Sequence, residues 1–198
     1  MHGMVNKGLQ TYLTDIFGAE VWEDVCTAGG LSQFNFETML TYDDELTEQI
    51  VVGATKTLNR SRDDILEDFG THVAGAEGLP VVRQLLQFGG ENFEEFLQSL
   101  EEMHDLCRIV LPELDVPVFV LDASHAGACT VHYTFEKPGY GAVFLGILRA
   151  VASAYDTLAL VEHVADPTGT SGVFAISVLQ TGWSDDPSTN PTMPEVTL

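Results

Sequence analysis

The sequence has few basic residues for its length. Eight Lys and Arg residues stand against 30 Asp and Glu residues in a chain of 198, which gives a formal net charge of −22. This excess of negative charge argues against binding to the phosphate backbone of nucleic acids or to anionic membranes. We therefore expect no nucleic acid partner and no membrane insertion, and any protein partner should present a basic surface.

Cysteines and long apolar runs are also scarce. Cys26, Cys107 and Cys129 are widely spaced and form no C-x-x-C pair, which fits a reducing compartment better than a disulfide framework and gives no support for a zinc site. No apolar run reaches the roughly 18–20 residues of a membrane span, and no apolar signal region follows the first residues. These absences predict a soluble, cytoplasmic protein.

Motifs for enzymatic chemistry are missing as well. The chain contains no G-x-S-x-G, P-loop or dinucleotide-binding fingerprint. No carboxylate pair stands out among so many acidic residues, and His125, His132 and His163 lie on or beside predicted strands without metal-ligand spacing. The sequence therefore predicts a binding domain and not an enzyme.

The first 111 residues have the spacing of helices with short breaks. Helices are expected within residues 5–18, 20–30, 43–59, 61–75 and 80–88, and a long one follows Gly89 and Gly90. Ser61 and Asp64 have the arrangement of a capping box at the fourth of these helices. The glycine pair at 29–30 is a natural helix end.

Beyond Pro112 the pattern changes to strands. Segments rich in β-branched and aromatic residues predict strands at 116–122, 129–136, 158–165 and 172–181, with a helix over 140–155. The predicted fold class is α+β, with a helical subdomain of about residues 1–111 followed by a four-stranded antiparallel sheet with an inserted helix, residues 112–184. The polar, proline-rich residues 185–198 are expected to be a disordered tail.

One histidine lies in an apolar helical stripe. Spacings of three and four residues connect Phe93, Phe96, Leu97, Leu100, Met103, His104, Cys107, Val110 and Leu111. From these residues alone, His104 is either a packed histidine bonded to a nearby carbonyl or a neutral imidazole that ligates haem iron. A role as a general base has no visible acid or nucleophile to support it.

The surroundings of His104 resemble a known family. The stretch "EEMHDLC", the opening "MHGMVNKGLQTYLTDIFGAEVW" and Pro117, thirteen residues after His104, are together similar to the haem–nitric oxide/oxygen binding (H-NOX) domains, relatives of the soluble guanylate cyclase haem domain. The resemblance covers roughly residues 1–181 and implies the same fold, with one domain over residues 1–184. It also implies that His104 ligates haem b and that Pro117 packs against the haem and distorts it.

The family's Y-x-S-x-R signature, whose side chains hold the haem propionates, corresponds to "YTFEK". Tyr133 is retained, Phe135 replaces the serine and Lys137 replaces the arginine. Lysine offers a point charge where arginine offers a planar fork, and phenylalanine has no hydroxyl. If propionates bind here, Tyr133 and Lys137 hold them with fewer hydrogen bonds. The alternative is an ordinary strand end in a haem-free module with another ligand or none.

The resemblance also bears on the choice of gas. Oxygen binders of the family carry a distal tyrosine, and its slot, aligned through "FLG", falls on Val143, while Tyr140 lies near the turn. The positions that the resemblance places against haem outside the signature are apolar: Val5, Leu9, Val73, Leu100, Met103 and Val143. Such a site implies nitric oxide or carbon monoxide as the gas ligand.

The resemblance implies a two-state switch. Gas binding weakens the bond between iron and His104, the strain at Pro117 relaxes, and the helical half moves against the sheet half. No kinase or cyclase sequence follows the sheet, so the output is expected to pass to a separate histidine kinase or cyclic-di-GMP enzyme. The leading hypothesis is a haem-dependent nitric oxide sensor, and the alternative is a haem-free interaction module with the same fold.

Overall fold

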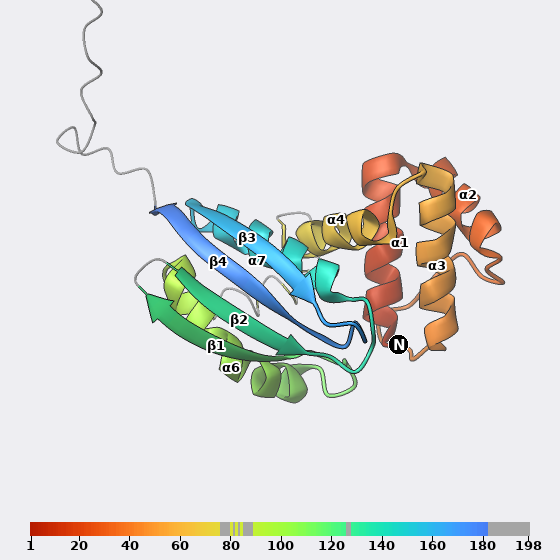
Figure 1. Cartoon of the computed structure of the whole chain (residues 1–198). Helices are drawn as coiled ribbons and strands as arrows, with labels where there is room; N and C mark the ends of the chain where they lie inside the picture. Colours follow the sequence, from red (N-terminus) through yellow and green to blue (C-terminus); the bar gives the residue numbers. More distant parts are fainter. Residues whose placement is uncertain (76–79, 81, 83, 85–88, 126–127, 182–198) are drawn as a thin grey trace, which may run out of the picture.

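A computed structural model of the chain describes residues 1–75, 80, 82, 84, 89–125 and 128–181. The helices within these residues are α1 (Gly3–Phe17), α2 (Ala19–Gly29), α3 (Asp44–Leu58), α4 (Arg62–Ala74), α6 (Phe93–Val110) and α7 (Gly141–Ala154) (Figure 1). The strands are β1 (Val118–His125), β2 (Ala128–Thr134), β3 (Thr157–Ala165) and β4 (Ser171–Thr181). The helix predicted over 80–88 lies largely, and the tail predicted over 185–198 wholly, outside the described residues.

The helix ends follow local sequence signals. The capping box of α4 is confirmed, since the Asp64 amide donates to Ser61 Oγ over 3.1 Å and the Ser61 amide donates to Asp64 Oδ2 over 3.3 Å. Helix α2 ends at the glycine pair, where Gly30 adopts a left-handed φ of 73° that favours glycine. The long helix α6 begins after Asn92, whose side chain accepts the Glu95 amide over 2.9 Å.

The four strands form one antiparallel sheet in the order β1-β2-β4-β3. Val131 on β2 lies opposite Leu121 and Phe174, and the inward-facing Val131, Phe174 and Val161 are buried. Helix α6 packs against β1, and α7 packs against β3 (Figure 1). The predicted class, helices followed by a four-stranded antiparallel sheet with an inserted helix, is confirmed.

The helical half meets the sheet half mainly where α4 packs against α7. Their backbones touch at two glycines. A Cβ on Gly70 would lie 2.0 Å from the Val143 carbonyl oxygen, and one on Gly146 would lie 2.0 Å from the Glu67 carbonyl oxygen. A single hydrophobic cluster runs through both halves, so the two halves share one core.

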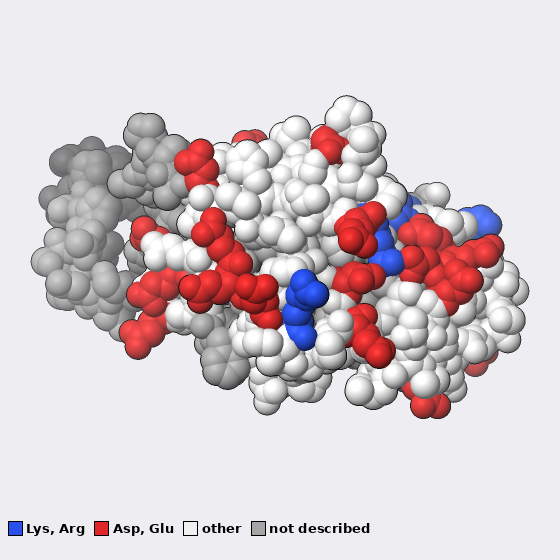
Figure 2. All heavy atoms as spheres, turned by 90° about the horizontal axis from the view of Figure 1, so that it is seen from below, with Lys and Arg blue, Asp and Glu red and all other residues white. Residues whose placement is uncertain are grey.

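The surface of the described residues is strongly acidic. Figure 2 views the molecule from the side on which α6 lies in Figure 1 and shows acidic atoms spread widely, with few basic ones. The exposed face of α6 carries Glu94, Glu95, Glu101, Glu102 and Asp105. The apolar stripe of α6 ends earlier than its spacing predicted, because Val110 lies in the last turn and is 47% exposed.

None of the helices within the described ranges combines the length and the apolar character that crossing a membrane requires.

Candidate functional site

His104 lies on α6, half-buried, and its ring is tied to the start of the sheet. Nδ1 of His104 is 3.3 Å from the carbonyl oxygen of Pro117, the residue directly before β1. Because a carbonyl only accepts, the neutral ring carries its proton on Nδ1 and keeps a lone pair on Nε2. Within the described residues Nε2 has no hydrogen-bond partner. Histidines that ligate metals have this arrangement, with one nitrogen bonded to an outer partner and the other free.

The apolar residues predicted to line the site are part of the hydrophobic core. Leu9 on α1, Leu100 on α6 and Val143 on α7 are buried in this core, while Val5 and Met103 pack against the core with partial exposure. Val73 on α4 belongs to the same core. These positions come from four helices and all belong to, or pack against, the one hydrophobic core of the molecule, although they are far apart in the sequence.

Tyr133, the first residue of the signature, has a partner within the protein. Its hydroxyl lies 3.0 Å from His163 Nε2, and its ring stacks on Phe174 with centroids 5.0 Å apart. Burial lowers the pKa of His163, so this imidazole is neutral near pH 7 and shares one hydrogen bond with the Tyr133 hydroxyl. His163 was expected only to occupy a sheet position. Its spacing of two from the buried Val161 on β3 is the signal that would have placed it on the inward face.

Phe135 fills an apolar space where the signature has a small hydroxyl residue. Its side chain is buried and lies edge-on to Phe144 and Tyr140, with ring centroids 5.4 and 5.9 Å away. Its amide donates to the Thr170 carbonyl over 2.8 Å. The middle of the signature is therefore part of the hydrophobic core.

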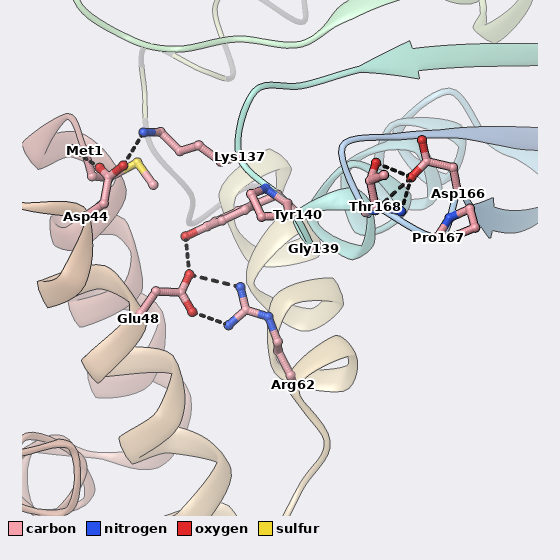
Figure 3. A pocket seen from close by; sticks show the side chains of 12 residues that line it. Met1, Asp44, Glu48, Arg62, Lys137, Gly139, Tyr140, Asp166, Pro167 and Thr168 are labelled. Carbon is pink, nitrogen blue, oxygen red and sulfur yellow. Dashed lines mark hydrogen bonds and ion pairs between the residues drawn. The ribbon is translucent and has the colours of Figure 1, made fainter.

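Lys137 is held by two carboxylates in an arrangement that we name the Lys137 cluster: the N-terminal amine of Met1, Asp44, Asp115 and Lys137. Nζ of Lys137 lies 2.5 Å from Asp44 Oδ2 and 3.2 Å from Asp115 Oδ2. The N-terminal amine lies 2.5 Å from Asp44 Oδ1 (Figure 3). No local motif marks Asp44 or Asp115 among 30 acidic residues, so sequence reasoning missed both.

A second polar network lies beside this cluster. Both oxygens of Glu48 accept from the Arg62 guanidinium, and Glu48 Oε1 also accepts the Tyr140 hydroxyl over 3.1 Å. Residues of both networks line a pocket of about 650 Å³: Met1, Asp44 and Lys137 from the first, and Glu48, Arg62 and Tyr140 from the second (Figure 3). Burial, together with the charge of Glu48, raises the pKa of Tyr140, so its hydroxyl stays protonated and turned toward Glu48.

The two ends of the predicted haem site differ in how well they suit haem. The histidine end fits, since the His104 ring has the donor arrangement of an iron ligand. The signature end does not fit haem propionates as it stands, since Tyr133 is bonded to His163 and Lys137 to two carboxylates. A propionate placed there would meet the negative charge of Asp44 and Asp115.

Comparisons with known proteins agree with this fold. A family model described as Haem-NO-binding matches residues 2–163. The Fe(II) unliganded H-NOX protein from K. algicida superposes with a TM-score of 0.78 at 20% identity, over 93% of this chain and 100% of that chain. The Fe(II)NO state of an H-NOX protein from S. oneidensis gives 0.78 at 14% identity, over 91% and 100%.

Curated relatives match over most of this chain but over little of their own length. Soluble guanylate cyclase gcy-31 of Caenorhabditis elegans is 20% identical over 152 residues, 77% of this chain and 22% of the relative. Soluble guanylate cyclase 89Da of Drosophila melanogaster is 22% identical over 166 residues, 84% of this chain and 25% of the relative. The chain therefore spans about a quarter of the length of these relatives.

Proposed function

Because the chain belongs to the Haem-NO-binding (H-NOX) family, we propose that it is a haem-dependent nitric oxide sensor domain with His104 as the iron ligand. Domains of this family are typically haem-based gas sensors. The observation that carries the proposal is the 3.3 Å contact between His104 Nδ1 and the Pro117 carbonyl, which orients the ring and leaves Nε2 available. Haem iron, when bound, supplies the gas-binding position.

The choice of nitric oxide rests on the apolar character of the surrounding side chains. Leu9, Val73 and Val143 offer no hydrogen-bond donor, and the hydroxyl of Tyr140 is already donated to Glu48. Dioxygen needs such a donor for tight binding, whereas nitric oxide and carbon monoxide do not. We therefore propose selectivity for nitric oxide over dioxygen.

The link between His104 and Pro117 also supports a route for the signal. Pro117 directly precedes β1, and α6 packs along that strand, so a shift of α6 is passed to the sheet. We propose that the output is a changed contact with a separate histidine kinase or cyclic-di-GMP enzyme. The chain itself is assigned no catalytic role.

The proposal is tested by the absorption spectrum of protein purified with haem supplied during expression. We expect a Soret band in the reduced protein that shifts when nitric oxide is added, and no spectrum of a stable oxygenated complex in air-saturated buffer. His104→Gly should lose or alter this band, and added imidazole should restore it by filling the space of the missing side chain. The control His132→Ala changes an exposed histidine on β2 and should leave the spectrum unchanged.

A second candidate function is a haem-free interaction module. The observation that favours it is the internal pairing of Tyr133 with His163 and of Lys137 with Asp44 and Asp115. A folded protein that stays colourless after hemin is added would support this function and end the sensor proposal. A Soret band that depends on His104 would exclude it.

A further inference from the structure

The Lys137 cluster joins four separate parts of the chain. Lys137 follows β2, Asp44 begins α3, Asp115 lies between α6 and β1, and Met1 precedes α1. The Lys137 side chain is only 19% exposed, so its ammonium depends on these carboxylates for most of its hydrogen bonds. Hydrogen bonds from Lys137 and the N-terminal amine lower the pKa of Asp44. The Asp44 carboxyl therefore stays ionised at neutral pH.

The charge around the adjoining pocket is already negative. Three formal positive charges belong to the N-terminal amine, Arg62 and Lys137, and each is paired with a carboxylate. Asp44, Glu48 and Asp115 pair with these cations, and a fourth carboxylate, Asp166, also lines the pocket and accepts hydrogen bonds within its own turn. Two further carboxylates from a porphyrin would raise the negative charge without gaining a free cation, and like charges within about 4–6 Å repel.

We propose that Asp44 and Asp115 are specificity-determining residues of the ligand site. As internal counter-ions of Lys137, they weaken the binding of any ligand that places a charged carboxylate beside Lys137. The inference rests on the proposed function, since it concerns the site in which haem would bind. A dianionic porphyrin binds only after displacing Asp44 and Asp115 from Lys137. A porphyrin whose carboxylates are esterified meets no such competition.

The proposal predicts how two porphyrins compare. Hemin carries two charged propionates and hemin dimethyl ester carries uncharged methyl esters, so the change in the ratio of their dissociation constants between wild type and a charge variant reports the contribution of charge. We expect the wild-type chain to bind the ester at least as tightly as hemin. Asp44→Asn and Asp115→Asn should each tighten hemin by about tenfold, the usual scale for removing one nearby like charge, and should leave the affinity for the ester nearly unchanged.

A matched control comes from the same loop as Asp115. Glu113→Gln also removes one negative charge, but Glu113 is exposed and forms no ion pair within the described residues. Glu113→Gln should therefore change neither the affinity for hemin nor the affinity for the dimethyl ester. Asp115→Asn serves as the second variant if Asp44→Asn disturbs the start of α3. Thermal unfolding without porphyrin adds a second readout, in which Asp44→Asn and Lys137→Met should be less destabilising together than the sum of the two separate effects.

The titration distinguishes failure of this inference from failure of the proposed function. Hemin binding that is equally tight in wild type, Asp44→Asn and Asp115→Asn overturns the inference and leaves the sensor proposal standing. A tenfold gain in hemin affinity in the Asn variants supports the inference. If the absorption spectrum is at the same time unchanged by His104→Gly and by nitric oxide, the sensor proposal fails. If no variant binds either porphyrin, both fail.

Discussion

Arg62 and Glu48 are joined by two parallel hydrogen bonds of 2.7 and 3.0 Å, and this pair connects α4 to α3. The guanidinium also lies over the Tyr140 ring, with Cζ 5.6 Å from the ring centroid. The pair thus brings together two helices of the helical half and the residue directly before α7. Its side chains are 32% and 46% exposed, so water screens much of their attraction.

We expect Arg62→Met to lower the free energy of unfolding by about 1 kcal/mol, since a bidentate but partly exposed pair is worth about 0.5–1 kcal/mol. Glu48→Gln should cost a similar amount, and the double variant should cost less than the sum. Urea unfolding of the four proteins measures this coupling. Strictly additive effects would show that the two side chains do not interact in solution.

The order of elements and several helix ends followed from local sequence. The capping box at Ser61 and Asp64 and the glycine end of α2 depend on neighbours within a few residues, which periodicity and residue type reveal. The contacts of the signature residues Tyr133 and Lys137, in contrast, do not depend on residues close to them in the sequence. Lys137 and Asp44 are 93 residues apart and Tyr133 and His163 are 30 apart, so these contacts arise from the tertiary fold. The order β1-β2-β4-β3 is likewise set by packing and not by any local pattern.

The glycine contacts between α4 and α7 predict that two substitutions of glycine by alanine destabilise the protein, although alanine usually stabilises a helix. Alanine is favoured over glycine within a helix by about 1 kcal/mol. At Gly70 and Gly146, however, a methyl group would lie 2.0 Å from a backbone oxygen of the facing helix. We expect Gly70→Ala and Gly146→Ala each to lower the free energy of unfolding by about 2 kcal/mol or more, because the helices must separate. A stabilised variant would show that the two backbones are not in contact.

His163 predicts a loss of stability in mild acid. Burial lowers its pKa, and the charge of Asp63 opposes this shift in part. The unfolded chain therefore takes up a proton on His163 at higher pH than the folded chain does, so stability falls as the pH drops below about 6.5. His163→Gln removes this titration. We expect the melting temperature of wild type to fall more than that of the variant between about pH 7.5 and about pH 5.5, and equal losses would contradict the assignment.

A buried polar pair between α1 and α3 gives a sharper test of hydrogen bonding in the core. Thr47 Oγ1 donates to Asn6 Oδ1 over 2.6 Å, and both side chains are fully buried. Thr47→Val keeps the shape but leaves the Asn6 carbonyl without this donor, which should cost about 1–3 kcal/mol. Thr47→Ser keeps the hydroxyl and loses one methyl group, at about 1 kcal/mol. Chemical denaturation in which the valine variant is the more stable of the two would refute this account.

Restoring the serine of the family signature at position 135 should not by itself restore binding of haem propionates. Phe135 is part of the aromatic cluster with Tyr140 and Phe144, and removing a buried phenylalanine side chain costs about 3–5 kcal/mol. We therefore expect Phe135→Ser to lower the melting temperature strongly. Its hemin affinity should not exceed that of Phe135→Ala, which opens the same space without adding a hydroxyl.

The reason lies in Lys137, whose ion pairs with Asp44 and Asp115 do not involve the side chain at position 135. A new hydroxyl adds one donor for a propionate, but the carboxylates that repel it stay in place. Only the combination of Phe135→Ser with Asp44→Asn should bind hemin more tightly than Phe135→Ala with Asp44→Asn. Hemin titrations of these four variants separate the two contributions. A gain from Phe135→Ser alone would mean that the hydroxyl, and not the counter-ions of Lys137, limits haem binding in this domain.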